Sequence, residues 1–328
     1  MLRYGGFIFY GAEMETLKAD ILISAHGSVY FEKCLSAALS QRTAARVIVC
    51  DNSTDNTVRE ISEKYACQKL ILLRPEEPLT LHESCVRMAE ISAAQWVRIL
   101  QDSEILAENS LEKRLEQAET FGGISMTFSA YTSITPDGKR HRIYYDLPEY
   151  VKGEDYLFNI FEETPIKQFT NILIKKDILL SALFRELSPF SEWVPAAAVM
   201  IAMTEGDLVY SSETMVTRYE TQPAETPEPE MLLDEAESMM SVLTYIETAT
   251  ENKKNAKRLK KELMAEIIRQ NTINLITEKR WKDIRGYIFG AWQINKKAVL
   301  GTVFHISVLG LAARAAGRAL KNLRPVSK

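Results

Sequence analysis

Short apolar runs of strand length alternate with segments of helical periodicity over the first hundred residues. The runs occupy 21–25, 46–50, 69–73 and 96–100, and the intervening helical patterns occupy 30–41, 54–66 and 81–94. This alternation is typical of βαβ units, which bury a largely parallel sheet beneath helices. We therefore expect an α/β fold with a doubly wound, mostly parallel central sheet.

The pattern changes after residue 122 and predicts a mixed α/β half. A Pro136-Asp137-Gly138 turn between two apolar segments, 124–130 and 141–145, indicates a hairpin. Further β structure is expected at 168–175 and 208–219, around an apolar helix at 193–203.

A proline-rich segment divides the chain. Pro223, Pro227 and Pro229 stand among glutamates, a composition that sustains neither a helix nor a ladder. We expect an α/β domain at 1–222, a linker at 223–230 and an α-helical region at 231–328.

Charge is distributed unevenly along the chain. Residues 1–252 hold 22 Lys and Arg against 40 Asp and Glu, whereas residues 253–328 hold 18 against 4. A basic end on an acidic body can bind its own body, nucleic acid or anionic lipid. The longest apolar stretch, 298–313, falls short of the roughly 20 residues that a membrane span needs. With no secretory signal and four unpaired cysteines, the sequence predicts a cytoplasmic protein.

Polar residues follow three of the four expected strands. In an open parallel sheet, ligands bind beyond the carboxyl ends of the strands. The turns are Ser24-Ala25-His26-Gly27, Asp51-Asn52-Ser53-Thr54-Asp55-Asn56-Thr57 and Gln101-Asp102-Ser103-Glu104. The Asp51 carboxylate can accept hydrogen bonds from a base or ribose, and Ser53 and Thr54 can cap the next helix. An ordinary capping turn would explain that stretch taken alone.

Together these segments resemble the nucleotide-binding half of the family 2 glycosyltransferases, which have a GT-A fold. The matching residues are Ile21-Leu22-Ile23-Ser24-Ala25-His26 and Val47-Ile48-Val49-Cys50-Asp51-Asn52-Ser53-Thr54-Asp55-Asn56-Thr57, and the likeness covers roughly 19–220. It implies a Rossmann-like GT-A domain with a nucleotide site at Ser24, Ala25, His26, Asp51, Ser53 and Asp102, in which Asp51 reads the base.

The resemblance also implies an activity. A sugar would pass from a nucleotide diphosphate, commonly UDP, to a saccharide or lipid-linked saccharide with inversion, in the synthesis of a cell-surface glycan. Two other classes remain open. One is a catalytically inactive or metal-independent relative that binds nucleotide-sugar or glycan; the other is a nucleotidyltransferase, which typically opens with a Gly-rich basic loop.

The turn after the fourth strand is similar to the family's metal-binding Leu-x-Asp-x-Asp segment. Two carboxylates one residue apart can approach one hard cation. The resemblance therefore implies that Asp102 and Glu104 hold Mn²⁺ or Mg²⁺. Glu104 stands where Asp is usual, and in another register Gln101 and Ser103 replace both acids, so a solvated turn is the alternative.

An inverting transfer needs a general base beside the acceptor hydroxyl, and a carboxylate can serve. Glu192, in Pro189-Phe190-Ser191-Glu192-Trp193, occupies the place that matches the family's base. The alternative is structural, because Ser191 can cap the next helix and Glu192 can favour its positive end.

The last helix combines an apolar body with basic flanks. Lys296 and Lys297 precede the body, and Arg314, Arg318, Lys321 and Arg324 follow it. Such a helix suits an anionic membrane surface, which would place the protein peripherally on the inner face of the cell membrane. A bundle core or the seam of a homo-oligomer suits it equally. We expect no nucleic-acid partner.

Overall fold

The computed structural model describes residues 19–43, 46–161, 166, 168–188, 193–220 and 228–300. Contacts divide the chain into two compact units. The first is Met1–Glu225 with Thr248–Glu251, and the second is Thr226–Glu247 with Asn252–Lys328.

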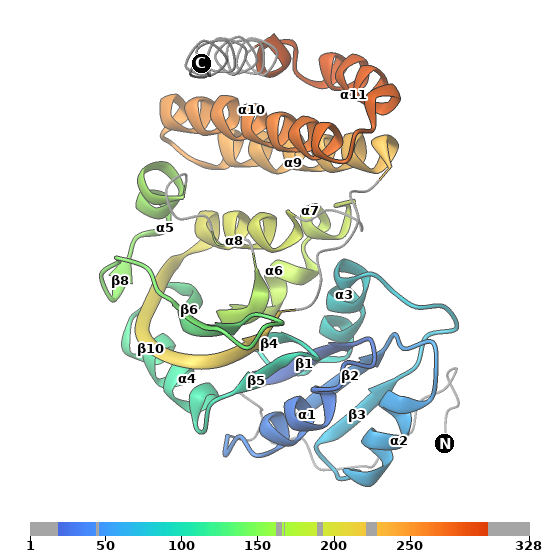
Figure 1. The fold of residues 1–328 in the computed structure, drawn as a ribbon. Helices are drawn as coiled ribbons and strands as arrows, with labels where there is room; N and C mark the ends of the chain where they lie inside the picture. Colours follow the sequence, from blue (N-terminus) through green and yellow to red (C-terminus); the bar gives the residue numbers. More distant parts are fainter. Residues whose placement is uncertain are drawn as a thin grey trace, which may run out of the picture. The chain divides into compact units, whose positions relative to one another are not determined.

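The first unit is built on four parallel strands in the order β3-β2-β1-β4 (Figure 1). They are β1 (Ala19–Ala25), β2 (Val47–Asp51), β3 (Leu70–Leu73) and β4 (Trp96–Gln101). β1 and β2 are buried at every position, which explains why their sequences are continuous apolar runs rather than alternating ones. The four strands expected from sequence are confirmed to within one or two residues at each end.

Helices connect these strands, as expected. They are α1 (Phe31–Leu39), α2 (Thr57–Lys64) and α3 (Leu81–Ile91). Thr80 and Glu83 form a reciprocal capping box at the start of α3, in which each side chain accepts a hydrogen bond from the other's backbone N–H. α3 packs on β1 and β2, while α1 contacts α2.

Beyond β4 the sheet becomes mixed and continues β4-β9-β6-β10-β5. Its strands are β5 (Glu104–Leu106), β6 (Ile124–Ile134), β7 (Arg140–Ile143), β8 (Tyr150–Val151), β9 (Ile172–Lys175) and β10 (Asp207–Tyr219). The expected hairpin is confirmed, because β6 and β7 pair antiparallel. The expectation of β structure over 168–175 is wrong in its first half, where a 3₁₀ turn, η2 (Phe169–Asn171), precedes β9.

Short helices cover this half of the first unit. They are α4 (Ser110–Thr120), α5 (Gly153–Asp155), the π-helical turn η1 (Tyr156–Ile160), α6 (Lys176–Leu180), α7 (Ala182–Arg185) and α8 (Val194–Glu205). α8 is buried along ten of its twelve residues, as its uniformly apolar sequence requires.

The second unit is helical over its described residues. It consists of α9 (Pro229–Ala249), α10 (Lys253–Thr277) and α11 (Trp281–Ile294). α9 begins at Pro229, inside the segment expected to be linker, because proline is well tolerated in the first turn of a helix. Most of the apolar helix expected at 298–313 lies outside the described residues.

A buried carboxylate fixes the start of β1. The Asp20 side chain is fully buried, and its Oδ1 accepts a hydrogen bond from the backbone N–H of Arg46 at 3.0 Å. Its Oδ2 accepts from the Arg46 guanidinium at 2.9 Å and from the Ser92 hydroxyl at 2.8 Å. A buried charge is tolerated only when it is paired and hydrogen-bonded, so these contacts tie β1 to the start of β2 and the end of α3.

Replacing Asp20 with Ala should therefore lower the free energy of unfolding by about 3 kcal/mol, because three donors lose their shared acceptor. Urea denaturation followed by circular dichroism measures the change. Glu60→Ala, at an exposed position of α2, is the control and should stay within about 0.5 kcal/mol of the wild type. A loss below about 1 kcal/mol for Asp20→Ala, within the range of an ordinary substitution, would contradict this account.

Candidate functional site

The register of the parallel strands gathers the three polar turns at one edge of the sheet. Asp51 pairs with Ala25, and Gln101, which precedes Asp102, pairs with Ser24. Adjacent strands lie about 4.8 Å apart, so Asp51 and Asp102 flank the end of β1. The turns that follow β1, β2 and β4 therefore meet at one place.

Asp102 fixes the loop that follows β1. Its Oδ2 accepts a hydrogen bond from the backbone N–H of His26 at 2.7 Å and another from that of Ser28 at 2.9 Å. Gly27 stands between them with φ +87°, a left-handed conformation that glycine adopts without strain. Asp102 is only 6% exposed, so its carboxylate acts mainly within the protein.

The predicted nucleotide residues of β1 divide into buried and exposed groups. Ser24 and Ala25 are fully buried, whereas His26 is exposed. The Ser24 hydroxyl lies 3.3 Å from His26 Nε2, within hydrogen-bond distance. Ala25 contributes through its backbone, because its carbonyl accepts from the N–H of Asn52 at 2.7 Å. His26 is therefore the side chain of this loop that can reach a ligand.

Asp51 carries an unused acceptor at the same edge. Its Oδ1 accepts from the Ser53 hydroxyl at 2.5 Å and from the Ser53 backbone N–H at 3.1 Å. Its Oδ2 is buried and has no hydrogen-bond partner among the described residues. Buried polar atoms in native proteins are nearly always hydrogen-bonded, so Oδ2 is a natural acceptor for a ligand N–H or O–H.

Asn52 is a buried residue whose side chain joins the segments that form this edge. Its side-chain N–H₂ donates to the hydroxyls of Ser24 at 3.1 Å and Ser84 at 2.9 Å, and its Oδ1 accepts from the backbone N–H of Leu79 at 2.9 Å. These bonds join β1, β2 and the start of α3. The sequence did not predict this role. Asn52 stands in a stretch that an ordinary capping turn explains, and its partners lie 27 to 32 residues away.

Arg74 is a second residue that the sequence analysis missed. Its Nε lies 3.8 Å from Asp51 Oδ2, and its guanidinium donates to Asn56 Oδ1 at 3.0 Å and to the Asp55 carbonyl at 3.3 Å. Arg74 directly follows β3, so the rule about strand ends, applied to the third strand, would have found it.

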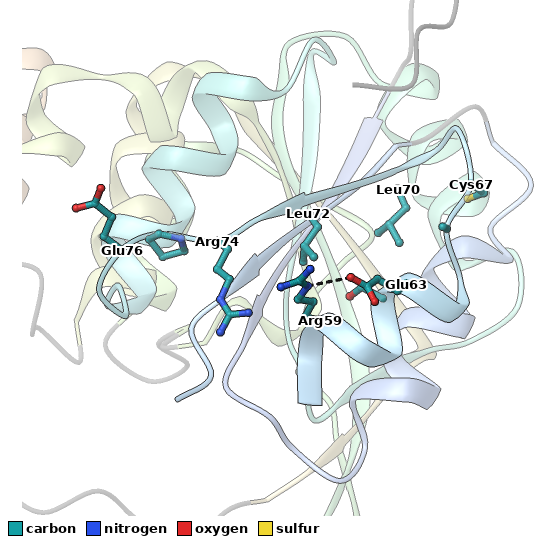
Figure 2. Close-up of a pocket in the computed structure, with 10 residues that line it drawn as sticks. Arg59, Glu63, Cys67, Leu70, Leu72, Arg74 and Glu76 are labelled. Carbon is teal, nitrogen blue, oxygen red and sulfur yellow. Dashed lines mark hydrogen bonds and ion pairs between the residues drawn. The ribbon is translucent and has the colours of Figure 1, made fainter. Parts of the chain in front are cut away.

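A hollow of about 600 Å³ lies between α2 and β3, and Arg74 forms part of its wall (Figure 2). Leu70 and Leu72 line its apolar side, and an ion pair between Arg59 and Glu63, 2.9 Å long, borders it. Arg74 both lines the hollow and contacts Asp51, so the hollow lies next to the Asp51 turn.

The end of β10 also reaches this edge. The rings of Tyr30 and Tyr219 are stacked with their centroids 3.8 Å apart. The backbone N–H of Tyr219 donates to the carbonyl of Ser103 at 3.0 Å. The start of α1, the turn after β4 and the last strand are thus joined beside Asp102.

Glu104, the second predicted metal ligand, makes its hydrogen bonds to a different part of the fold from Asp102. Its side chain is 1% exposed, and its oxygens accept from the Thr170 hydroxyl at 2.5 Å and from the Gln101 backbone N–H at 3.2 Å. Burial raises its pKa, against smaller lowering effects of Thr170, Arg218 and Arg98. A buried carboxylate engaged in this way does not fit a cation shared with Asp102. Over the part of the chain that the structure describes, no group of three or more His, Cys, Asp or Glu residues could hold a metal ion.

Glu192, the expected general base, lies outside the described residues. α8 begins at Val194, so Glu192 precedes this helix by two residues, and its role stays a prediction.

Polar turns at the carboxyl ends of parallel strands are the place where α/β domains bind their ligands. Residues 20–181 match the model of the family described as Glycosyl transferase family 2. The chain therefore carries a family 2 glycosyltransferase domain and belongs among the nucleotide-sugar-dependent glycosyltransferases. A comparison with curated proteins finds no match.

Solved structures share the GT-A fold. Staphylococcus aureus TarS 1-349 in complex with UDP-GlcNAc superposes with a TM-score of 0.62 at 10% identity, over 87% of this chain and 89% of that one. The same protein in complex with UDP gives 0.59 at 13% identity, with the same coverage. The mannosyltransferase PcManGT from Pyrobaculum calidifontis, in complex with GDP-Man and Mn²⁺, gives 0.51 at 13%, over 90% and 81%.

Replacing Asn52 with Ala should lower the free energy of unfolding by about 2–3 kcal/mol, because the buried N–H of Leu79 and the two serine hydroxyls lose their partner. Chemical denaturation measures this loss. Thr54→Ala is the matched control, since Thr54 is an exposed residue of the same turn and should change stability by about 0.5 kcal/mol or less. Equal effects of the two variants would show that Asn52 does not hold the edge together.

Proposed function

We propose that this protein transfers a sugar from a UDP-sugar to a saccharide or lipid-linked saccharide, with inversion at the anomeric carbon, in the synthesis of a cell-surface glycan. The observation that carries the proposal is the buried Oδ2 of Asp51 at the edge where three strand-end turns meet, because this oxygen has no hydrogen-bond partner among the described residues and only the more distant Arg74 Nε, at 3.8 Å, as an ionic neighbour. A carboxylate oxygen in that position can accept the imide N–H of uracil.

Neighbouring groups suit the rest of a nucleotide. The Arg74 guanidinium stands beside Asp51 and can donate to a carbonyl of the base. His26 is exposed in a loop that Asp102 holds rigid. A preformed site of this kind binds its ligand without the cost of ordering a mobile loop.

The chemical step is a single displacement at the anomeric carbon. The acceptor oxygen forms the new bond while the bond from that carbon to the diphosphate breaks, and UDP leaves with the electron pair. The proton of the acceptor hydroxyl passes to a base. Glu192, just before α8, is our candidate for this base.

A catalytically inactive relative that only binds nucleotide-sugar is the second candidate. The departures at Gln101 and Ser103 favour it, because two acids usual in the family are absent there. Release of UDP from candidate donors separates an enzyme from a binding protein.

We also propose that the second unit binds an anionic membrane surface. Within α11, Trp281 is 64% exposed and Phe289 is 70% exposed, and the basic residues Lys282 and Arg285 are exposed on the same helix. Trp281, Arg285 and Phe289 recur every four residues and so share one face. A hollow of about 1060 Å³ adjoins them, lined in part by Ile276, Ile288 and Trp292.

Charge favours lipid as the occupant of this face. The second unit, 226–247 with 252–328, holds 18 basic against 10 acidic residues, so two copies of the unit would repel each other and an anionic leaflet would attract them. Aromatic side chains with basic neighbours are typical of interfacial helices. None of the helices in the described ranges is both long and apolar enough to span a bilayer, so binding would occur at the surface.

UDP, tested beside GDP and dTDP, should raise the melting temperature of the protein, because a ligand that binds only the folded state adds about 2.7 kcal/mol of stability at a hundredfold excess over its Kd. Thermal-shift measurements test this. Asp51→Ala should abolish the shift by removing the free acceptor, whereas Asp137→Ala, in the exposed turn between β6 and β7, should keep it. No shift with any of the three nucleotides would contradict the donor site.

The protein should sediment with phosphatidylglycerol-containing vesicles and not with pure phosphatidylcholine vesicles. Each basic residue near an anionic surface contributes about 1 kcal/mol, so Lys282→Gln with Arg285→Gln should weaken binding at least about tenfold. Lys33→Gln, on the exposed side of α1, is the control. Equal binding to both kinds of vesicle, or a stable dimer with no vesicle binding, would contradict the proposal.

A further inference from the structure

The turn from Gln101 to Glu104 sends its two carboxylates to opposite flanks of β4. In the sheet, β1 lies on one side of β4 and β9 on the other. Asp102 bonds to the loop that follows β1, and Glu104 bonds to Thr170 of η2, the turn that leads into β9. One hard cation requires ligands that converge on it, and these two carboxylates diverge.

Asp102 contributes to the site through the backbone. Its Oδ2 holds the N–H groups of His26 and Ser28 on either side of Gly27. A charged acceptor makes such hydrogen bonds roughly twice as strong as a neutral one does. The shape of the loop beside Asp51 therefore depends on this carboxylate.

Glu104 belongs to a buried polar cluster behind the edge. The cluster holds η2: Arg98 donates to the carbonyls of Thr170 and Ile172, and Arg114 donates to that of Asn171 at 2.8 Å. Arg98 is buried, and burial lowers its pKa to about 10. The negative charge of Glu104 lies close to this guanidinium and opposes the lowering of its pKa. On β5, Glu104 lies opposite Arg218 of β10 in the register of the sheet. Its carboxylate is thus engaged inside the fold.

We infer that Asp102 is a positioning residue, which shapes the nucleotide site by holding the backbone of His26 and Ser28, and that the nucleotide binds there without a divalent cation held by Asp102 and Glu104. The inference rests on the proposed donor site and specifies how that site is built. It separates two roles that a carboxylate could have: a metal ligand needs the charge, whereas the loop needs only an acceptor oxygen.

Substitution of Asp102 distinguishes these roles. Asp102→Asn keeps an oxygen that can accept from both N–H groups but removes the negative charge, and Asp102→Ala removes both. Titration calorimetry of UDP into the full chain, once with Mn²⁺ and once with EDTA, gives the Kd of each variant. We expect the wild-type Kd to agree within about threefold between the two buffers, the Asn variant to lie within about tenfold of the wild type, and the Ala variant to bind at least about thirtyfold more weakly. Asp137→Asn is the matched control.

Hydrogen–deuterium exchange of the segment 24–30 gives a readout that does not depend on UDP. The amides of His26 and Ser28 should be protected in the wild type and in Asp102→Asn, and should exchange faster in Asp102→Ala while the peptides of β2 and β4 keep their protection. Unchanged exchange in Asp102→Ala would overturn the positioning role.

Binding that is at least about tenfold tighter with Mn²⁺, with the gain lost in Asp102→Asn, would overturn the metal-independent part of the inference. Failure of the proposed function would give a different result. UDP would then bind in neither buffer, and the inferred nucleotide site would be wrong as well.

Discussion

The parallel register of β1 between β2 and β4 is the constraint on which the site depends. A slip of one residue would turn every side chain of β1 to the opposite face of the sheet and would separate Asp51 from the loop that Asp102 holds. Polar contacts fix β1 at both ends. Asp20 binds Arg46 and Ser92 at its start, and Asp102 binds the backbone just after its end. The continuous apolar strand carries little register information of its own, so these buried polar contacts supply it.

The proposed donor site depends on an acceptor that the hydrogen bonds of the fold leave unused. Asn52 makes three hydrogen bonds that join β1, β2 and the start of α3, and Asp102 satisfies two backbone donors. By contrast, Oδ2 of Asp51 is a buried carboxylate oxygen that has no hydrogen-bond partner among the described residues. An acceptor held rigidly in a desolvated position binds a complementary donor more strongly than a mobile one does.

Much of this architecture was predictable from sequence, and the exceptions have physical causes. Apolar runs gave the strands, and the strand-end rule led to Asp51 and Asp102. The resemblance paired Glu104 with Asp102, but a spacing of two residues implies a common face only within a continuous strand. A turn at Asp102 and Ser103 separates β4 from β5, so the two carboxylates reach different partners. Arg74 directly follows β3, so the strand-end rule applied to that strand would have found it, whereas Tyr219 acts through a contact between distant segments that no local pattern records.

The candidate site lies in a strongly acidic part of the chain, so the groups close to it matter for an anionic ligand. Residues 1–252 are strongly acidic, with 40 Asp and Glu against 22 Lys and Arg, and a nucleotide diphosphate is itself an anion. Long-range repulsion between them is screened beyond about 8–10 Å at physiological ionic strength, so the balance is decided by groups close to the ligand. Arg74 stands beside Asp51. Behind the edge, burial raises the pKa of Glu104, and Thr170, Arg218 and Arg98 oppose that rise. Arg98 and Arg218 thus lie close to the Glu104 carboxylate inside the fold, and Arg74 offers a positive group at the edge itself.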